Sequence, residues 1–155
     1  MAKPPKPGNG DEVPNLYVLY PRDSERWRAS ARAIKRLRAA AESGSSEAAH
    51  NLAWMYRTGT EVEQDIEAAA KWYRVAADAG LASAQFSLGL LLISGDGIER
   101  DYGEALKWLS LAAANGDPEI SRECPPYILQ LSIALGPEKT GEAVIAAWHW
   151  QLSKQ

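Results

Sequence analysis

A 36-residue period is the feature that most constrains how this chain folds. When the sequence is shifted by 36 positions against itself, glycines, aspartates, alanines and a tryptophan coincide. The coinciding positions are Leu52 and Leu88, Gly59 and Gly95, Asp65 and Asp101, Ala69 and Ala105, Trp72 and Trp108, Ala76-Ala77 and Ala112-Ala113, and Gly80 and Gly116. A period of about 20–50 residues is typical of repeat proteins. We therefore divide the chain into two full repeats, 46–81 and 82–117.

Each repeat is predicted to form two helices. Apolar residues recur at helical spacing in its first half, at Ala48, Leu52, Met55 and Tyr56, and at Ala84, Leu88, Leu91 and Leu92. Gly59 and Gly95 are predicted to end this first helix. Asp65 and Asp101 are predicted to cap the second helix, with Glu104 completing a capping box after Asp101. The second helix is predicted to bury Ala69, Trp72, Tyr73 and Ala76, and their counterparts Ala105, Trp108, Leu109 and Ala112.

The pattern weakens toward both ends, as expected for terminal repeats that face water on one side. A half-repeat is predicted at 24–45, and a degenerate capping repeat at 118–153. Within the latter, Pro125-Pro126 predicts a break between a helix at 118–123 and another at 127–135. Gly136-Pro137 then precedes a last helix from about residue 140. The expected fold is an all-α, right-handed α/α superhelical solenoid of about seven helices, spanning 22–155.

The remaining segment, 1–21, is rich in proline and glycine, so we expect it to be flexible. Its apolar run Leu16–Tyr20 is a candidate for docking on the solenoid. No apolar stretch follows the N-terminal basic residues as in a secretory signal, and no run is long enough to span a bilayer. We therefore expect a cytoplasmic protein, and a monomer.

Composition argues against several kinds of chemistry. The chain has one cysteine, Cys124, and two histidines far apart, so neither a disulfide nor a metal cluster is expected. It contains no nucleotide-binding glycine motif and no nucleophile elbow. Its net charge of −3 gives no reason to expect nucleic acid. We expect a protein that is not an enzyme and that needs no cofactor.

The repeat residues resemble the Sel-one-like repeat (SLR) family, a relative of the tetratricopeptide repeats. The matching residues are Ala48, Asn51-Leu52-Ala53, Met55-Tyr56, Gly59, Val62, Asp65, Ala69, Trp72-Tyr73, Ala76-Ala77 and Gly80, with their counterparts in 82–117. Glu61 stands where the second repeat has Gly97, so we expect the first loop to turn differently. The resemblance implies a superhelical scaffold for protein partners, with no catalytic residue.

One face of the first helices is a candidate binding surface. Its residues are His50, Trp54 and Arg57 in the first repeat and Phe86, Leu90 and Ile93 in the second. Spacings of four and three put each trio on one stripe. First helices usually line the concave side of a solenoid, and tryptophan and arginine are favoured binding anchors. We therefore expect a protein or peptide partner here, with an adaptor as the leading interpretation.

Three alternatives remain open at the level of sequence. The protein could be an inhibitor or immunity factor that occludes an enzyme, or a structural subunit that self-associates through its end faces. A third alternative is binding to nucleic acid or an acidic surface through the basic helix 22–38, where Arg28, Arg32 and Arg36 share a face. Trp148 and Trp150 cannot both face one core, so the exposed one is a secondary contact candidate.

Overall fold

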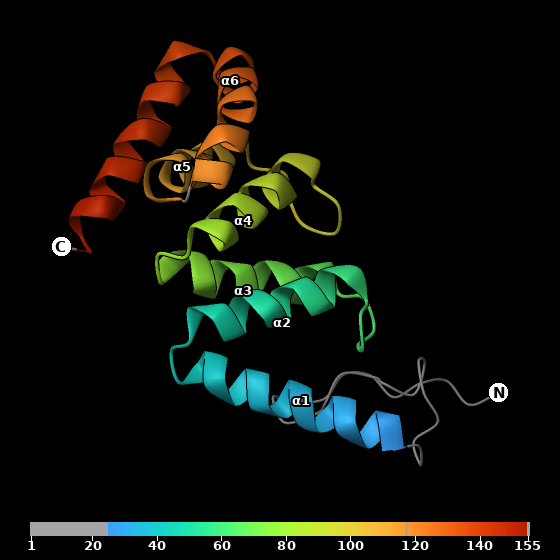
Figure 1. The fold of residues 1–155 in the computed structure, drawn as a ribbon. Helices are drawn as coiled ribbons and strands as arrows, with labels where there is room; N and C mark the ends of the chain where they lie inside the picture. The colour runs from blue at the N-terminus through green and yellow to red at the C-terminus, as the bar shows by residue number, and fades with distance from the viewer. Residues whose placement is uncertain (1–24, 117, 155) are drawn as a thin grey trace.

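The computed structural model describes residues 25–116 and 118–154, and every element in them is a helix. The helices are α1 (Glu25–Glu42), α2 (Ser46–Thr58), α3 (Ile66–Asp78), α4 (Ala82–Ser94), α5 (Tyr102–Asn115) and α6 (Pro118–Leu152). They stack in chain order, with α1 at one end and α6 at the other (Figure 1). The pairs α2–α3 and α4–α5 are the two full repeats, so the predicted helical solenoid is confirmed.

Short-range hydrogen bonds set the helix ends where the sequence predicts them. The Asp65 carboxylate accepts a hydrogen bond from the Ala68 N–H at 2.9 Å, and the Asp101 carboxylate accepts one from the Glu104 N–H at 2.8 Å. Gly59 and Gly95 end α2 and α4 in the left-handed conformation, with φ of 71° and 69°. Such caps satisfy backbone groups that a helix end leaves unpaired.

The capping box predicted at the start of α5 is wrong in its second half. The Asp101 N–H donates to the Leu92 carbonyl at 3.1 Å instead of to the Glu104 carboxylate. That carboxylate accepts hydrogen bonds from Arg74 and from the Trp108 indole. The Asp65 N–H makes the equivalent bond to the Tyr56 carbonyl at 2.9 Å, although Ala68 stands at the position of Glu104, so this backbone bond is shared by both repeats.

Small residues let the helices of a pair approach closely, and large ones fill the space between pairs. Ala69 and Ala105 are completely buried, and a Cβ built on Gly89 would lie 2.7 Å from the Leu109 side chain. Trp108 is 1% exposed, whereas its counterpart Trp72 is half-buried. Both pack with the core, as the repeat predicts.

The loop of the first repeat turns in the same way as that of the second, contrary to expectation. Glu61 has a φ of 62°, close to the 71° of Gly97. A Cβ on Gly97 would lie 2.9 Å from the Cβ of Ile66, whereas the counterpart of Ile66 one repeat earlier is Ser30. Ser30 is small and its hydroxyl donates a hydrogen bond to the Glu61 carboxylate. The facing residue thus accommodates a side chain in a conformation that usually favours glycine.

The predicted break at Pro125-Pro126 is also wrong, because α6 continues through both prolines. Both proline residues are exposed, so their rings lie on the solvent side of the helix. On the other side of the helix, Cys124 and Leu131 are buried, and the Ser121 hydroxyl donates to the Ala113 carbonyl at 3.0 Å. Packing against α5 therefore outweighs the missing hydrogen bonds.

The break at Gly136 is confirmed, since this residue has a φ of 77° and a ψ of 173°. It divides α6 into a proximal rod, 118–135, and a distal rod, 137–152. Counting the rods separately makes seven helical segments among the described residues, close to the predicted number. The segment Leu16–Tyr20, which the sequence suggests could dock on the solenoid, lies outside the described residues.

Candidate partner-binding surface

The face of α2 that is not used by the core presents Trp54 and Arg57. Trp54 is 44% exposed and Arg57 is also exposed, while the neighbouring Leu52 and Ala53 are completely buried. The spacing of three places the tryptophan and the guanidinium on one side of the helix. This part of the predicted stripe is therefore open to solvent, with an aromatic surface beside a charged hydrogen-bond donor.

His50 and Tyr73 form the floor beside this open part. The two rings are 5.4 Å apart and tilted by 59°, with His50 half-buried and Tyr73 completely buried. Burial lowers the pKa of His50, the nearby Arg57 charge acts in the same direction, and a hydrogen bond with Asn51 opposes both. The imidazole is therefore neutral at physiological pH.

The hydroxyl of Tyr73 is buried and makes no hydrogen bond within the described part of the chain. Burial raises the pKa of this phenol, against the opposing influence of Arg57 and Ser87. Burying an unpaired polar atom costs free energy. Tyr73 thus places a buried phenol hydroxyl close to the side chains of Arg57 and Ser87.

The second half of the stripe is partly covered. Phe86 packs edge-on against Tyr127 of α6, with ring centroids 6.0 Å apart, and Leu90 and Ile93 are half-buried. The residues 36 positions after Phe86, Leu90 and Ile93 are Arg122, Pro126 and Leu129 of the proximal rod. All three are exposed. Leu129, at 64% exposed, was missed as a candidate, although the 36-residue period points to it. We call the set formed by the six predicted residues and Leu129 the A-helix stripe, where the A helix is the first helix of a repeat. Its members are His50, Trp54, Arg57, Phe86, Leu90, Ile93 and Leu129.

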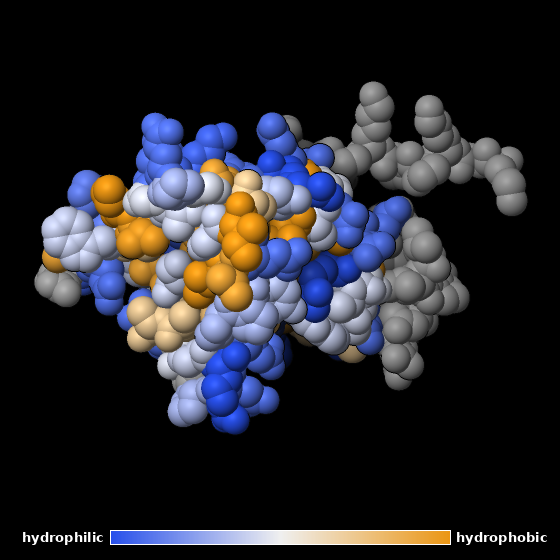
Figure 2. All heavy atoms as spheres, turned by 90° about the horizontal axis from the view of Figure 1, so that it is seen from above, coloured by the Kyte–Doolittle hydropathy of each residue, from blue (hydrophilic) through white to orange (hydrophobic). Residues whose placement is uncertain are grey.

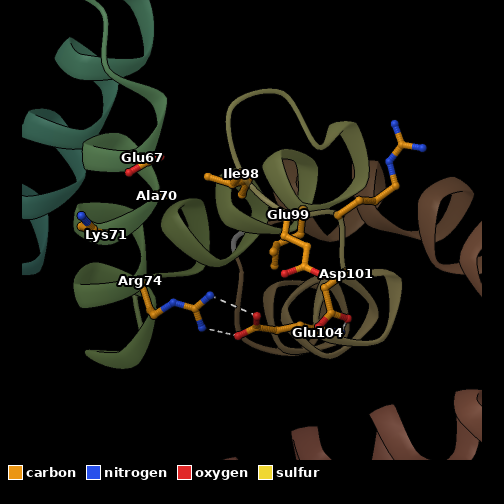
Figure 3. A pocket seen from close by; sticks show the side chains of 10 residues that line it. Glu67, Ala70, Lys71, Arg74, Ile98, Glu99, Asp101 and Glu104 are labelled. Carbon is orange, nitrogen blue, oxygen red and sulfur yellow. Dashed lines mark hydrogen bonds and ion pairs between the residues drawn. The ribbon is translucent and has the colours of Figure 1, made fainter.

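A groove lies between the two repeats, where α3 meets the loop before α5. This groove has a volume of about 420 Å³ and is lined by acidic and basic side chains, including Glu67, Lys71, Arg74, Glu99 and Glu104. Figure 3 shows Arg74 reaching across it to Glu104. The two groups bind in a fork, with one of the two contacts at 3.0 Å. The hydrogen bonds from Arg74 lower the pKa of Glu104, and the Trp108 indole adds to this effect.

The groove contains an ion pair that joins the two repeats, which we call the clasp, and it is a weaker candidate for a binding pocket. Two of its charges already neutralise each other, because the Arg74 guanidinium pairs with the Glu104 carboxylate, which also accepts a hydrogen bond from the Trp108 indole at 3.2 Å. The sequence carries no signal for this pair, whose members are 30 positions apart and have no counterparts in the other repeat.

The secondary candidates are dispersed. Arg32 and Arg36 are exposed on α1 together with Lys35, while the side chain of Arg28 lies outside the described residues. Trp148 is 58% exposed on the distal rod, whereas the Trp150 ring packs 5.9 Å from that of Trp108. These residues therefore do not join the A-helix stripe in one site.

Fold and surface together define a helical-repeat solenoid with an open aromatic and cationic face. The family model of the Sel1 repeat matches residues 46–81 and 82–117, the same two units that the 36-residue period marks. The chain therefore carries two Sel1 repeats. None of the curated proteins compared with it matches.

Two solved structures are similar to this chain over most of its length. One is a protective antigen present in uropathogenic Escherichia coli strains, described as displaying an SLR fold, with a TM-score of 0.70 and 29% identity. The other is a Sel1 repeat protein from Oxalobacter formigenes, with a TM-score of 0.55 and 29% identity. The similarity covers 88% of this chain and 28% of the first protein, and 69% of this chain and 51% of the second. The chain thus spans only part of each protein's length.

Two further observations limit the site chemistry. In the described ranges 25–116 and 118–154, no group of three or more His, Cys, Asp or Glu side chains could hold a metal ion. None of the helices described there is both long and apolar enough to cross a membrane.

Proposed function

We propose that the protein is a non-enzymatic interaction module that binds a protein or peptide on the A-helix stripe. The observation that supports this most directly is the exposure of Trp54 beside Arg57, on a helix whose core contacts are made by other residues. Trp54 is not among the residues that pack with the core, so nearly half of its large aromatic surface is available to a partner. Sel1 repeats in general serve as protein-interaction scaffolds, which agrees with this assignment.

Binding would begin on α2 and continue along the solenoid. Trp54 and Leu129 supply apolar anchors at the two ends of the stripe, and Arg57 supplies a charged donor between them. Buried aromatic and arginine anchors account for most of the affinity of typical interfaces. The Tyr73 hydroxyl and the neutral His50 imidazole add hydrogen-bonding groups at the floor. We place this function in the cytoplasm, in keeping with the free, buried thiol of Cys124.

The test is capture of partners from the native host by the chain and by the variant Trp54→Ala with Leu129→Ala. Both side chains are exposed, so we expect unchanged helicity and thermal midpoint together with loss of the captured partner. Val75→Ala is the matched control, because Val75 is 45% exposed on α3, away from the stripe. If the folded double variant retains the same partner as the parent, the stripe is not the binding surface.

The class of partner separates the remaining alternatives. An inhibitor or immunity protein uses the same surface, and its captured partner is an enzyme whose activity falls on binding. Binding through the basic face of α1 instead survives Trp54→Ala, is lost in Arg32→Glu with Arg36→Glu, and falls steeply with salt. The latter pattern would replace the proposed function.

A further inference from the structure

The outer side of the distal rod of α6 carries an apolar strip that neither the fold nor the A-helix stripe uses. Val144, Ile145, Trp148 and Leu152 are 51%, 55%, 58% and 47% exposed. The opposite side of the same rod is buried through Ala143 and Ala147. Seen from the α6 end of the molecule, apolar side chains are exposed at several places on the surface (Figure 2). Contiguous exposed apolar side chains of this kind mark interfaces.

The spacing along this strip is that of a helix-pairing seam. Gly141, Ile145, Trp148 and Leu152 follow one another at intervals of four, three and four, the alternation of a heptad seam. Gly141 has open space around it, with nothing within 4 Å of a Cβ built there. The seam therefore has a small residue at one end, large ones along the rest, and room for another helix on top.

The seam is complementary to itself when two copies run antiparallel. Placing Ile145 of one copy beside Trp148 of the other brings Leu152 opposite Gly141, so a large side chain meets the open position at both ends. Glu142 and His149 lie seven positions apart on one flank, so this arrangement also brings Glu142 of each copy near His149 of the other. The opposite flank carries the uncharged Val144 and Gln151.

We propose that the distal rod binds a second copy of this chain, forming a two-fold symmetric antiparallel helix pair. An isologous contact of this kind closes on itself and does not grow into a filament. The surface of one helix is small compared with the interfaces of about 1,200–2,000 Å² that hold stable complexes. The dimer is therefore weak and reversible, and it leaves the A-helix stripe of each copy free for a partner.

Sedimentation equilibrium of the full chain over a range of concentrations tests this proposal. We expect a monomer–dimer equilibrium, and Trp148→Glu should raise its dissociation constant at least tenfold. Val75→Glu, an equally exposed apolar position on α3, should leave that constant unchanged. If Trp148→Glu loses helicity by circular dichroism, Leu152→Lys at the end of the rod replaces it. A chain that stays monomeric at every concentration, or a dimer that Trp148→Glu does not weaken, overturns the proposal.

Charge exchange tests the antiparallel arrangement itself. Glu142→Lys and His149→Glu should each weaken the dimer, the second because two carboxylates then face each other. Combining the two changes places a lysine and a glutamate opposite each other and should recover much of the parental dissociation constant. In a parallel pair these two positions do not face each other. Failure of the combined variant to recover affinity therefore overturns the arrangement.

Discussion

The two full repeats have the same helix pair and the same loop conformation at Glu61 and Gly97, but different side chains pack at equivalent positions. In the first, Glu61 occupies a left-handed loop position and is bound by Ser30; in the second, Gly97 occupies that position and Ile66 fills the space against it. The tryptophans also differ, since Trp108 is buried between α5 and the distal rod while Trp72 is half-buried. The equivalent loop positions Glu61 and Gly97 therefore keep the same conformation, while the residues that face them differ.

The largest expected difference between the repeats concerns the tryptophans. Trp108→Ala should destabilise the protein by about 3–5 kcal/mol, the usual cost of removing a fully buried aromatic side chain. Trp72→Ala should cost less, because part of the Trp72 side chain is already in contact with solvent. Chemical denaturation of both variants, followed by circular dichroism, checks this order. Equal losses would mean that the two repeats contribute alike despite the difference in burial.

A smaller effect is expected from exchanging the loop residues. Gly97→Glu places a Cβ 2.9 Å from that of Ile66 and puts a side chain at a φ of 71°, so it should destabilise the protein by about 2–4 kcal/mol. Adding Ile66→Ser recreates the first repeat's pair and should recover part of that loss.

Glu61→Gly serves as the reverse control, measured by the same denaturation experiment. The backbone strain it relieves and the Ser30 hydrogen bond it removes are each about 1 kcal/mol, so its effect should be close to zero. If Gly97→Glu is as harmless as Glu61→Gly, the facing residue does not decide what the loop tolerates.

The smallest effect is expected for the ion pair that joins Arg74 of the first repeat to Glu104 of the second. The pKa of Glu104 is lowered in the folded state, chiefly by Arg74, so the carboxylate contributes stability at neutral pH that is lost as the pH falls through its folded pKa. Arg74 is substantially exposed, so this contribution should be below about 1 kcal/mol. Glu104→Gln should therefore flatten the acid side of the stability profile slightly, measured as denaturation midpoints against pH. An unchanged acid slope would show that the clasp adds nothing to stability.

Much of the candidate surface could be predicted from the sequence, but not how open each part is. Trp54 and Arg57 are exposed as their helical positions indicate, because they are away from the residues that repeat in the core. Phe86 has the same position in its repeat as His50. It nevertheless packs against Tyr127, because α6 lies against this part of α4. Leu129 could have been found by extending the period by one more unit.

By itself the sequence determined the period, the helix pairs and their caps, because these depend on residues three or four positions apart that hydrogen-bond or pack locally. Asp65 and Asp101 cap their helices through such local bonds. Tertiary structure alone decided that α6 continues through Pro125 and Pro126, and that the Asp101 N–H bonds to the Leu92 carbonyl while Glu104 binds Arg74. In these cases a partner about 30 positions or one helix away offers packing or charge that outweighs the local preference.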